Sequence, residues 1–291
     1  MNNQPIRQHW VPKAYLRAFC APPATKEQIY TYDLIEERGF KTKIDNIAVK
    51  RHLYTIGLGN EESSFVIESM LSRIESDVKP IFEEVNNRED LHMPPEARKT
   101  LSAFLSTMFM RTRLGLQMIR AHREEVRAKS LPPEMDLPEP FRTDLLSLDD
   151  NDERELFAKS VVSVGLKLTE VFESMYWHIL RAIDSHLITS ENPLVVFNPT
   201  EERWGLGTDK THIHFPLSPK LVLSISKEPL IPGNKTVNLP PDGVKGINGL
   251  TVLGAVQYLF SDRDFSSLRE LLADRPQSER RAFGPMHVKE T

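Results

Sequence analysis

Apolar residues in the middle of the chain recur at the spacing of α-helices. Between residues 63 and 88 they fall three or four positions apart, at Ile67, Leu71, Ile74, Val78, Ile81 and Val85. This spacing places them on one stripe of a long amphipathic helix. A second helix is predicted from Pro94–Pro95 to about Lys129, and a third from about Asp152 to Tyr176. Residues 63–176 are therefore predicted to form a helical middle.

Shorter apolar runs on either side of this middle predict β-strands. Gln28–Leu34 alternates polar and apolar residues, turns at Glu36–Gly39 and continues into Phe40–Ile44, which is the pattern of a β-hairpin. Beyond Trp177, short apolar runs separated by turn residues predict a mixed or antiparallel sheet. Its strands are expected at 187–188, 194–197, 213–215, 221–225 and 256–260.

The predicted fold class is α+β, with an N-terminal β-hairpin and a bundle of long helices packed on a mixed or antiparallel C-terminal sheet. Short helices at 243–254 and 266–272 complete it. The chain has 291 residues, 40% hydrophobic and 27% charged, so it can bury a substantial core as one domain or two closely joined lobes. We interpret residues 1–275 as a single domain and 276–291 as a disordered tail. The proline-rich acidic segment 131–150 is interpreted as a linker or lid.

Composition and charge exclude several functional classes. The 13 glycines form no nucleotide-binding fingerprint, and the single cysteine, Cys20, excludes an internal disulfide and a cysteine-rich zinc site. The net charge of −4 gives no global attraction to nucleic acid or anionic lipid, which leaves only a local basic groove open. No leader peptide is visible, and no apolar segment reaches the roughly 18 residues of a membrane helix. We therefore expect a cytoplasmic protein without a membrane partner.

The first two long helices carry charged residues at their apolar stripes. Glu68 and Glu75, seven residues apart, lie on one line that borders the stripe of the first helix. Arg111 falls within the stripe of the second helix, and Arg113 is more exposed, where it can face a ligand or only water. Pairing Arg111 with Glu68 or Glu75 satisfies both helices, because a guanidinium offers a planar fork of donors to a carboxylate. An equal alternative is a purely structural ion pair that holds the helices in register.

Gln8 and His9 stand immediately before a short helix that opens at Pro12. His9 can act as general acid, general base, metal ligand or capping donor, because its unperturbed pKa lies within the working range. Gln8 can orient a ligand beside it. The alternative is a structural histidine, which is the commoner role of a lone histidine.

A polar turn, Ser190–Asn192, follows a predicted strand and precedes Pro193, which favours an extended conformation for Asn192. Loops at strand ends are a usual place for functional side chains, and we take Ser190, Glu191 and Asn192 as site candidates. The alternative is an Asx-type turn that only caps the strand.

The remaining candidates are weaker. His212 and His214 alternate on one strand face, as a metal pair can, but no third ligand has a supporting spacing. Cys20 lies at an apolar helix end without an activating group, which predicts a packing role.

The N-terminal run Gln8-His9-Trp10-Val11-Pro12-Lys13-Ala14-Tyr15-Leu16, complete through Phe19, resembles the opening of a bacterial family, domain of unknown function 4238. That opening reads Gln-His-x-x-Pro-x-x-Tyr-Leu-x-x-Phe. The resemblance continues at Tyr54, Glu68, Glu75, Arg111, Thr189–Pro193, Phe215–Pro219 and Asn248, and so covers most of the chain as one domain. The family's turn usually has aspartate before Asn-Pro, where this chain has Glu191; the longer side chain departs from a strict metal-ligand or nucleophile position. The resemblance implies a shared site and names no activity.

Two classes of function fit these residues. The favoured one is a hydrolase of phosphodiesterase or nuclease type, acting on a phosphoester or nucleic-acid-like substrate, with a divalent metal as candidate cofactor. Its expected catalytic residues are His9, Glu68, Glu75, Arg111 and Glu191. Its expected substrate-binding residues are Gln8, Ser190, Asn192 and Arg113. The alternative is a non-catalytic ligand-sensing or protein-interaction module, for which 131–150 is the candidate docking segment.

Overall fold

The computed structural model describes residues 7–55, 65–120, 150–198, 206, 209–231 and 236–273. The predicted tail at 276–291 lies outside these ranges. So does the predicted linker or lid at 131–150, apart from Asp150, where a helix begins. Among the described residues, no helix is both long enough and apolar enough to cross a membrane.

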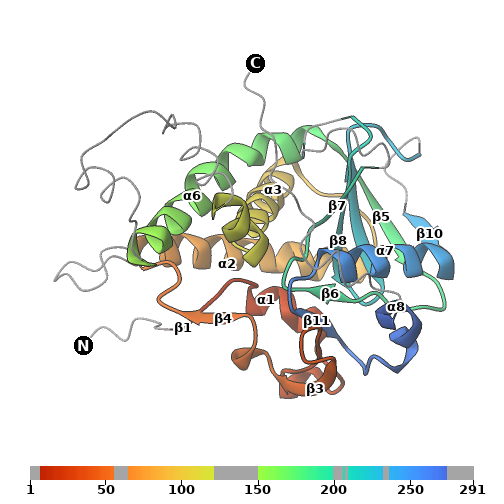
Figure 1. Cartoon of the computed structure of the whole chain (residues 1–291). Helices are drawn as coiled ribbons and strands as arrows, with labels where there is room; N and C mark the ends of the chain where they lie inside the picture. Colours follow the sequence, from red (N-terminus) through yellow and green to blue (C-terminus); the bar gives the residue numbers. More distant parts are fainter. Residues whose placement is uncertain are drawn as a thin grey trace, which may run out of the picture.

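The helical middle contains three long helices, α2 (Val66–Arg88), α3 (Pro95–Met110) and α6 (Asp150–Ser174). Helix α3 packs against both α2 and α6, and the three lie together on one side of the molecule (Figure 1). The apolar stripe predicted for α2 is largely buried, through Ile67, Leu71, Val78 and Val85. Burial of such a stripe, rather than intrinsic propensity, supplies most of a helix's stability in a protein.

The prediction of one continuous second helix to about Lys129 is wrong, because α3 ends at Met110. Helix α3 ends at Met110, Arg111 and Thr112 form a turn, and a new helix begins at Arg113. The Thr112 hydroxyl accepts a hydrogen bond from the Gly115 amide at 3.2 Å, which caps the new helix. Gly115 permits the turn, because a Cβ there would lie 2.0 Å from the Met110 carbonyl oxygen.

The larger sheet has the strand order β10-β5-β9-β8-β7. These strands are β10 (Val237–Leu239), β5 (Tyr176–Ala182), β9 (Leu221–Ser226), β8 (His212–Ser218) and β7 (Val195–Phe197). Only β10 and β5 pair in parallel among these neighbours, so the sheet is mixed. Its apolar face, which includes Trp177, Ile225 and Phe215, joins the same core as the long helices. The other face is partly covered by α7 (Pro241–Gly254), through Val244 and Ile247.

The smaller sheet joins the two ends of the chain. Its order is β3-β2-β11-β6, formed by β3 (Arg38–Lys43), β2 (Gln28–Asp33), β11 (Tyr258–Ser261) and β6 (Thr189–Ser190). The predicted N-terminal hairpin is therefore present as β2 and β3, and the C-terminal strand β11 pairs with its inner edge. The strand predicted at 187–188 appears instead at Thr189–Ser190. The Leu187 and Ile188 amides bond outside the sheet, to the Pro219 carbonyl and the Asn248 side chain.

A two-stranded ribbon and several short helices complete the described part of the chain. The ribbon pairs β1 (Arg7–His9) with β4 (Val49–Arg51). The short helices are α1 (Lys13–Leu16), η1 (Arg17–Phe19), η2 (Ala24–Lys26), η3 (Ile44–Asn46), η4 (Ser266–Leu268) and α8 (Arg269–Ala273). Tyr15 of α1 donates a hydrogen bond to the Pro216 carbonyl at 2.8 Å and lies 2.7 Å from the Thr189 hydroxyl. The N-terminal motif thereby contacts both sheets, and the predicted α+β class is confirmed.

Candidate functional site

Arg111 is the centre of the first polar cluster. It stands at the C-terminal end of α3, where its backbone leaves the helix with φ −85° and ψ 0°, and only 3% of the residue is exposed. Its guanidinium donates to Glu75 Oε1 at 2.6 Å, to the His9 carbonyl at 2.6 Å and to the Tyr54 hydroxyl at 3.3 Å. A buried arginine is stable only when its charge and its donors are satisfied, and these bonds join α2, α3 and β1.

Gln8 supports the cluster from behind. Its side-chain oxygen accepts from the Tyr54 amide at 2.6 Å, and its side-chain nitrogen donates to the Thr55 hydroxyl at 3.5 Å. The Tyr54 ring then lies under Arg111, with the guanidinium carbon 5.4 Å from the ring centroid. Burial raises the pKa of Tyr54 to about 12, so the phenol stays neutral. Gln8 is fully buried, and its side-chain hydrogen bonds are made within the fold, to residues 54 and 55.

The two aligned glutamates have different environments. Glu75 is the carboxylate paired with Arg111. Glu68 is half-buried, and its Oε2 atom is buried and has no hydrogen-bond partner within the described part of the chain. Burial raises the pKa of Glu68 and the charge of Glu75 adds to this, while the charge of Arg111 opposes it. The cluster therefore places a carboxyl group with a raised pKa beside an ion pair.

His9 lies at the edge of the same cluster, half-buried. Its Nε2 atom is 3.2 Å from the Ile44 carbonyl oxygen. A carbonyl only accepts, so in the neutral ring Nε2 carries the hydrogen and Nδ1 is left as an acceptor. Burial lowers the pKa of His9, as do the nearby charges of Lys13 and Arg111, while the Ile44 hydrogen bond and Glu75 raise it. The imidazole is consequently neutral at pH 7.

Arg113 is the centre of a second cluster, and it contacts Trp10, the residue after the His9 that Arg111 binds. Its guanidinium carbon lies 4.6 Å from the Trp10 ring centroid and 5.8 Å from that of Tyr258. Its Nη1 donates to Gln257 Oε1 at 2.7 Å and lies 3.8 Å from Glu191 Oε2. Arg113 is therefore a stacked, cation–π-stabilised side chain that contacts the C-terminal strand β11.

Glu191 is sealed inside this second cluster. Its residue exposure is 0%, and its Oε1 atom accepts from the backbone amides of Gln257 and, at 3.0 Å, Tyr258. Burial raises the pKa of Glu191, against the opposing effects of Arg113 and the backbone amides. Its contacts join the Ser190–Asn192 turn to the start of β11, and no substrate can reach them without local opening.

Asn192 and Ser190 are also engaged within the fold. Asn192 Oδ1 accepts from the Leu114 amide at 3.2 Å, in the first turn of the helix that begins at Arg113, and its Nδ2 donates to the Gly254 carbonyl at 2.7 Å. One amide side chain thus caps the start of one helix and the end of α7. The Ser190 hydroxyl donates to the Asn192 carbonyl and accepts from the Asn192 amide, both at 3.0 Å. This turn has the local side-chain bonding that defines Asx-type and related turns.

The predicted site residues therefore divide into two clusters. The structure brings Gln8, His9, Glu68, Glu75 and Arg111 together, and it places Arg113, Glu191, Ser190 and Asn192 in a separate group. The chain at His9 and Trp10 runs between them, since Arg111 binds the His9 carbonyl and Arg113 stacks on Trp10. Tyr54, Trp10 and Gln257 were not predicted. The family resemblance includes Tyr54 and spans Trp10, and it was the one sequence signal for these two residues. Gln257 lies in the strand predicted at 256–260, which gave no signal of a site role.

Metal ligation has no support in the described residues, because no group of three or more histidine, cysteine, aspartate or glutamate side chains is arranged to hold an ion. His212 and His214 stack with ring centroids 6.4 Å apart. Burial lowers the pKa of His214 to about 4, with a further contribution from His212. His178 lies two strands away on the same sheet face, because it pairs with Ser224, which pairs with His214. Cys20 is buried, as predicted for a packing role, and burial raises its pKa to about 11.

Comparison with protein families finds one match that spans most of the chain. A family model described as "Protein of unknown function (DUF4238)" matches residues 7–265. Both clusters lie within this range. Neither the curated proteins nor the solved structures contain a match to the chain.

Proposed function

The chain belongs to the DUF4238 family, whose description assigns no activity, and we propose from its first polar cluster that it is a bacterial cytoplasmic hydrolase of phosphodiester bonds. One observation carries the proposal: Glu68, whose pKa is raised by burial and whose Oε2 atom has no hydrogen-bond partner among the described residues, lies near the Glu75–Arg111 ion pair, and the same pair contacts His9, whose pKa is lowered. The bacterial assignment rests on the family resemblance, and the cytoplasmic one on the single cysteine.

The chemistry needs a proton donor and a proton acceptor of different strengths. Environments that push the pKa values of titratable neighbours in opposite directions are typical of acid–base sites. In the proposed step, His9 Nδ1 removes a proton from water as its oxygen bonds to phosphorus. The bond from phosphorus to the leaving oxygen breaks, and Glu68 gives that oxygen its proton. Arg111 is a positioning residue here, because its guanidinium holds His9 and Glu75 and is itself buried.

Basic side chains beside His9 support an anionic substrate. Successive residues of a strand point to opposite faces, so Arg7 and His9 share a face while Gln8 faces the interior. Arg51 of β4 stands directly opposite Arg7, and both are exposed. Like charges directly opposite one another destabilise a strand pair, and a bound phosphate removes that penalty. Lys13 lies close enough to His9 to lower its pKa. The net charge of −4 is compatible with such a local basic surface.

The activity should have a bell-shaped pH profile in the mildly acidic range. Glu68 must be protonated and His9 neutral at the same pH. With the ordinary pKa values of 4.5 for glutamate and 6.5 for histidine, no pH exists at which protonated Glu68 and neutral His9 both dominate. The pKa of Glu68 is raised and that of His9 is lowered, so the pH ranges of the two required forms move toward each other. The charged groups that face them are Arg111 and Glu75 for Glu68, and Lys13, Arg111, Glu75 and Asp45 for His9.

The test compares two substrates that differ in their leaving group, each with and without Mg²⁺, Mn²⁺ or Zn²⁺. Purified protein is assayed on a single-stranded oligonucleotide, whose alkoxide leaving group needs protonation, and on bis(p-nitrophenyl) phosphate, whose phenolate does not. Glu68→Gln should lower oligonucleotide hydrolysis by about 100-fold or more and spare the nitrophenyl ester. His9→Gln should lower both.

Glu83→Gln is the matched control, because Glu83 is an exposed carboxylate on the same helix. It should leave both rates unchanged, and all variants should keep the wild-type melting temperature within a few degrees. Absence of turnover by the wild type, or equal losses on both esters for Glu68→Gln, rejects Glu68 as the acid. Oligonucleotide binding without turnover would instead support the non-catalytic alternative, a ligand-sensing module. The protein-interaction form of that alternative is tested by deleting residues 131–150, which should remove complex formation.

A further inference from the structure

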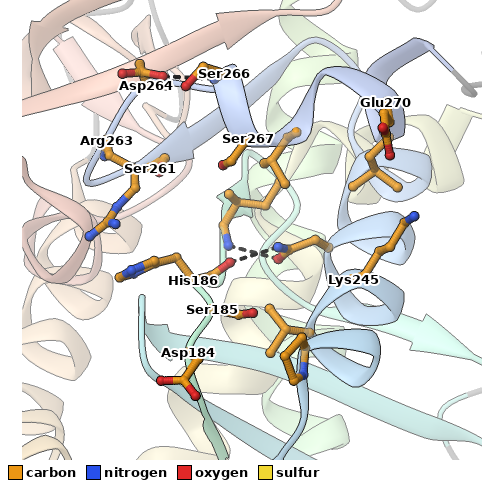
Figure 2. Close-up of a pocket in the computed structure, with 16 residues that line it drawn as sticks. Asp184, Ser185, His186, Lys245, Ser261, Arg263, Asp264, Ser266, Ser267 and Glu270 are labelled. Atoms are coloured by element: carbon orange, nitrogen blue, oxygen red, sulfur yellow. Dashed lines mark hydrogen bonds between the residues drawn. The ribbon is translucent and has the colours of Figure 1, made fainter.

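A surface cavity lies between the segment before β6, helix α7 and the stretch that follows β11, and none of the predicted site residues line it. Its volume is about 500 Å³, within the range of small-molecule sites. Three segments enclose it: residues 184–188, α7, and the stretch from Ser261 through η4 to α8 (Figure 2). Its apolar lining includes Ile188, Val244, Leu268 and Leu271.

Asn248 holds two walls of this cavity together. Its Oδ1 accepts from the Ile188 amide at 3.0 Å, and its Nδ2 donates to the His186 carbonyl at 2.9 Å, both shown as dashed lines in Figure 2. The residue is 2% exposed, so these bonds form away from water. A buried side chain with every polar group bonded fixes backbone positions, and the 186–188 wall is therefore preformed against α7.

The charged side chains are grouped at opposite ends of the cavity. The ring of His186 and the guanidinium of Arg263 lie on one side together with Asp184 and Asp264, and Lys245 and Glu270 lie on the other (Figure 2). Arg263 is exposed and bonds only to the neighbouring Asp262 among the described contacts of its guanidinium. Its outer face can therefore receive an anion.

His186 provides an unsatisfied polar atom at this end. Its Nδ1 atom is buried and has no hydrogen-bond partner within the described part of the chain. A buried polar atom without a partner carries a free-energy penalty, which a ligand can remove only if the cavity wall shifts enough to expose the atom. Burial and the charges of Arg263 and Lys220 lower the pKa of His186, while Asp262 raises it, so the ring is neutral and can donate one hydrogen bond.

We propose that this cavity binds a small carboxylate with an apolar body. The carboxylate lies against Arg263 and His186, and the hydrocarbon part covers Val244 and Leu271. A monoanion fits better than a phosphate dianion, because Asp184, Asp264 and Glu270 also line the cavity and repel a second negative charge. This site is separate from the proposed hydrolytic cluster, and neither proposal depends on the other.

The test uses 4-phenylbutyrate as the probe and 4-phenylbutanol as its neutral counterpart, with binding to the full chain measured by saturation-transfer NMR and calorimetry. The carboxylate should bind with a Kd of about 1 mM or tighter. The alcohol should bind about tenfold or more weakly, because a hydrogen bond to a charged group is lost.

Two variants and one control locate the binding. Arg263→Gln should weaken the carboxylate about tenfold and leave the alcohol unchanged, and Ser267→Trp, an exposed lining residue, should fill the cavity and remove binding of both. Arg269→Gln is the control, since Arg269 is an exposed arginine of α8 that does not line this cavity. Equal binding of acid and alcohol, or carboxylate binding that survives Ser267→Trp in a folded variant, would overturn the proposal, as would no detectable binding to the wild type.

Discussion

Arg111 and Glu75 form an ion pair of 2.6 Å between the end of α3 and the middle of α2. The side chain of Arg111 is 4% exposed and that of Glu75 is 23% exposed, so the pair joins the protein interior to its surface. The same guanidinium binds the His9 carbonyl, and the pair therefore also positions the N-terminal strand.

Arg111→Met should strongly destabilise the protein, because it leaves Glu75 without its cation and the His9 carbonyl without a donor. Breaking a buried pair by removing one partner costs about 3–5 kcal/mol. Urea denaturation followed by circular dichroism measures the loss. Arg88→Met, which removes an exposed i,i+4 pair with Glu84, should change the free energy of unfolding by less than about 1 kcal/mol. Equal effects of the two substitutions would show that Arg111 is not a structural centre.

Asn192→Ala should destabilise the protein by about 1–2 kcal/mol, because it removes a helix N-cap acceptor and the donor to the end of α7. Hydrogen exchange gives a local measure, since the Leu114 amide loses its acceptor and should exchange faster. Asn87→Ala, an exposed asparagine of α2, is the control and should leave that amide unchanged. Unaltered protection of Leu114 in Asn192→Ala would contradict the capping role.

Two glycine substitutions should have opposite signs. Gly115→Ala places a Cβ at 2.0 Å from the Met110 carbonyl oxygen, a backbone atom, so the chain must shift and the variant should be clearly destabilised. Gly246→Ala, within α7, meets no atom within 4 Å and should stabilise by about 0.5–1 kcal/mol through helix propensity. The melting temperatures of both variants, measured by thermal unfolding, test these predictions. A higher melting temperature for Gly115→Ala than for the wild type would contradict the turn described at 111–112.

Glu191 should make stability depend on pH. Its native pKa is raised, so its contribution is fully present below the ordinary value of 4.5 and is lost as pH rises through the native value. The free energy of unfolding of the wild type, relative to Glu191→Gln, should therefore fall as the pH rises above the ordinary pKa of 4.5. Glutamine keeps the Oε1 acceptor for the Tyr258 amide. Glu170→Gln, at an exposed position, should leave the pH dependence as in the wild type. Parallel pH curves for the wild type and Glu191→Gln would contradict the raised pKa.

Local patterns predicted the elements that depend on local periodicity. The helix now bounded by Val66 and Arg88 and the hairpin of β2 and β3 were visible because burial on one face imposes a period of 3.6 or 2. The break after Met110 was missed, since apolar residues continue past it and its cause is a capped turn. The strand β5 was missed as well: Tyr176–Ala182 follows a helix directly, and the partner of Tyr176 in β9 is Ser226, 50 residues further along the chain.

The candidate site was partly predictable for the same reason. Helix geometry placed Glu68, Glu75 and Arg111 on faces that could meet, and the structure selects Glu75 as the partner of Arg111. Helix geometry could not separate Glu191 from that group, because the hydrogen-bond partners of Glu191 are residues 257 and 258, far along the chain.

Taken alone, the amino-acid order determined which residues face inward, because apolar burial and helical or strand periodicity are local properties. It thereby determined that charged groups would be buried between α2 and α3. Only the tertiary structure decided which charges neutralise each other, which carboxyl groups have raised pKa values, and that Asn192 caps two helices. Those outcomes depend on distances between segments far apart in sequence, and electrostatic and hydrogen-bond energies change steeply over a few ångströms.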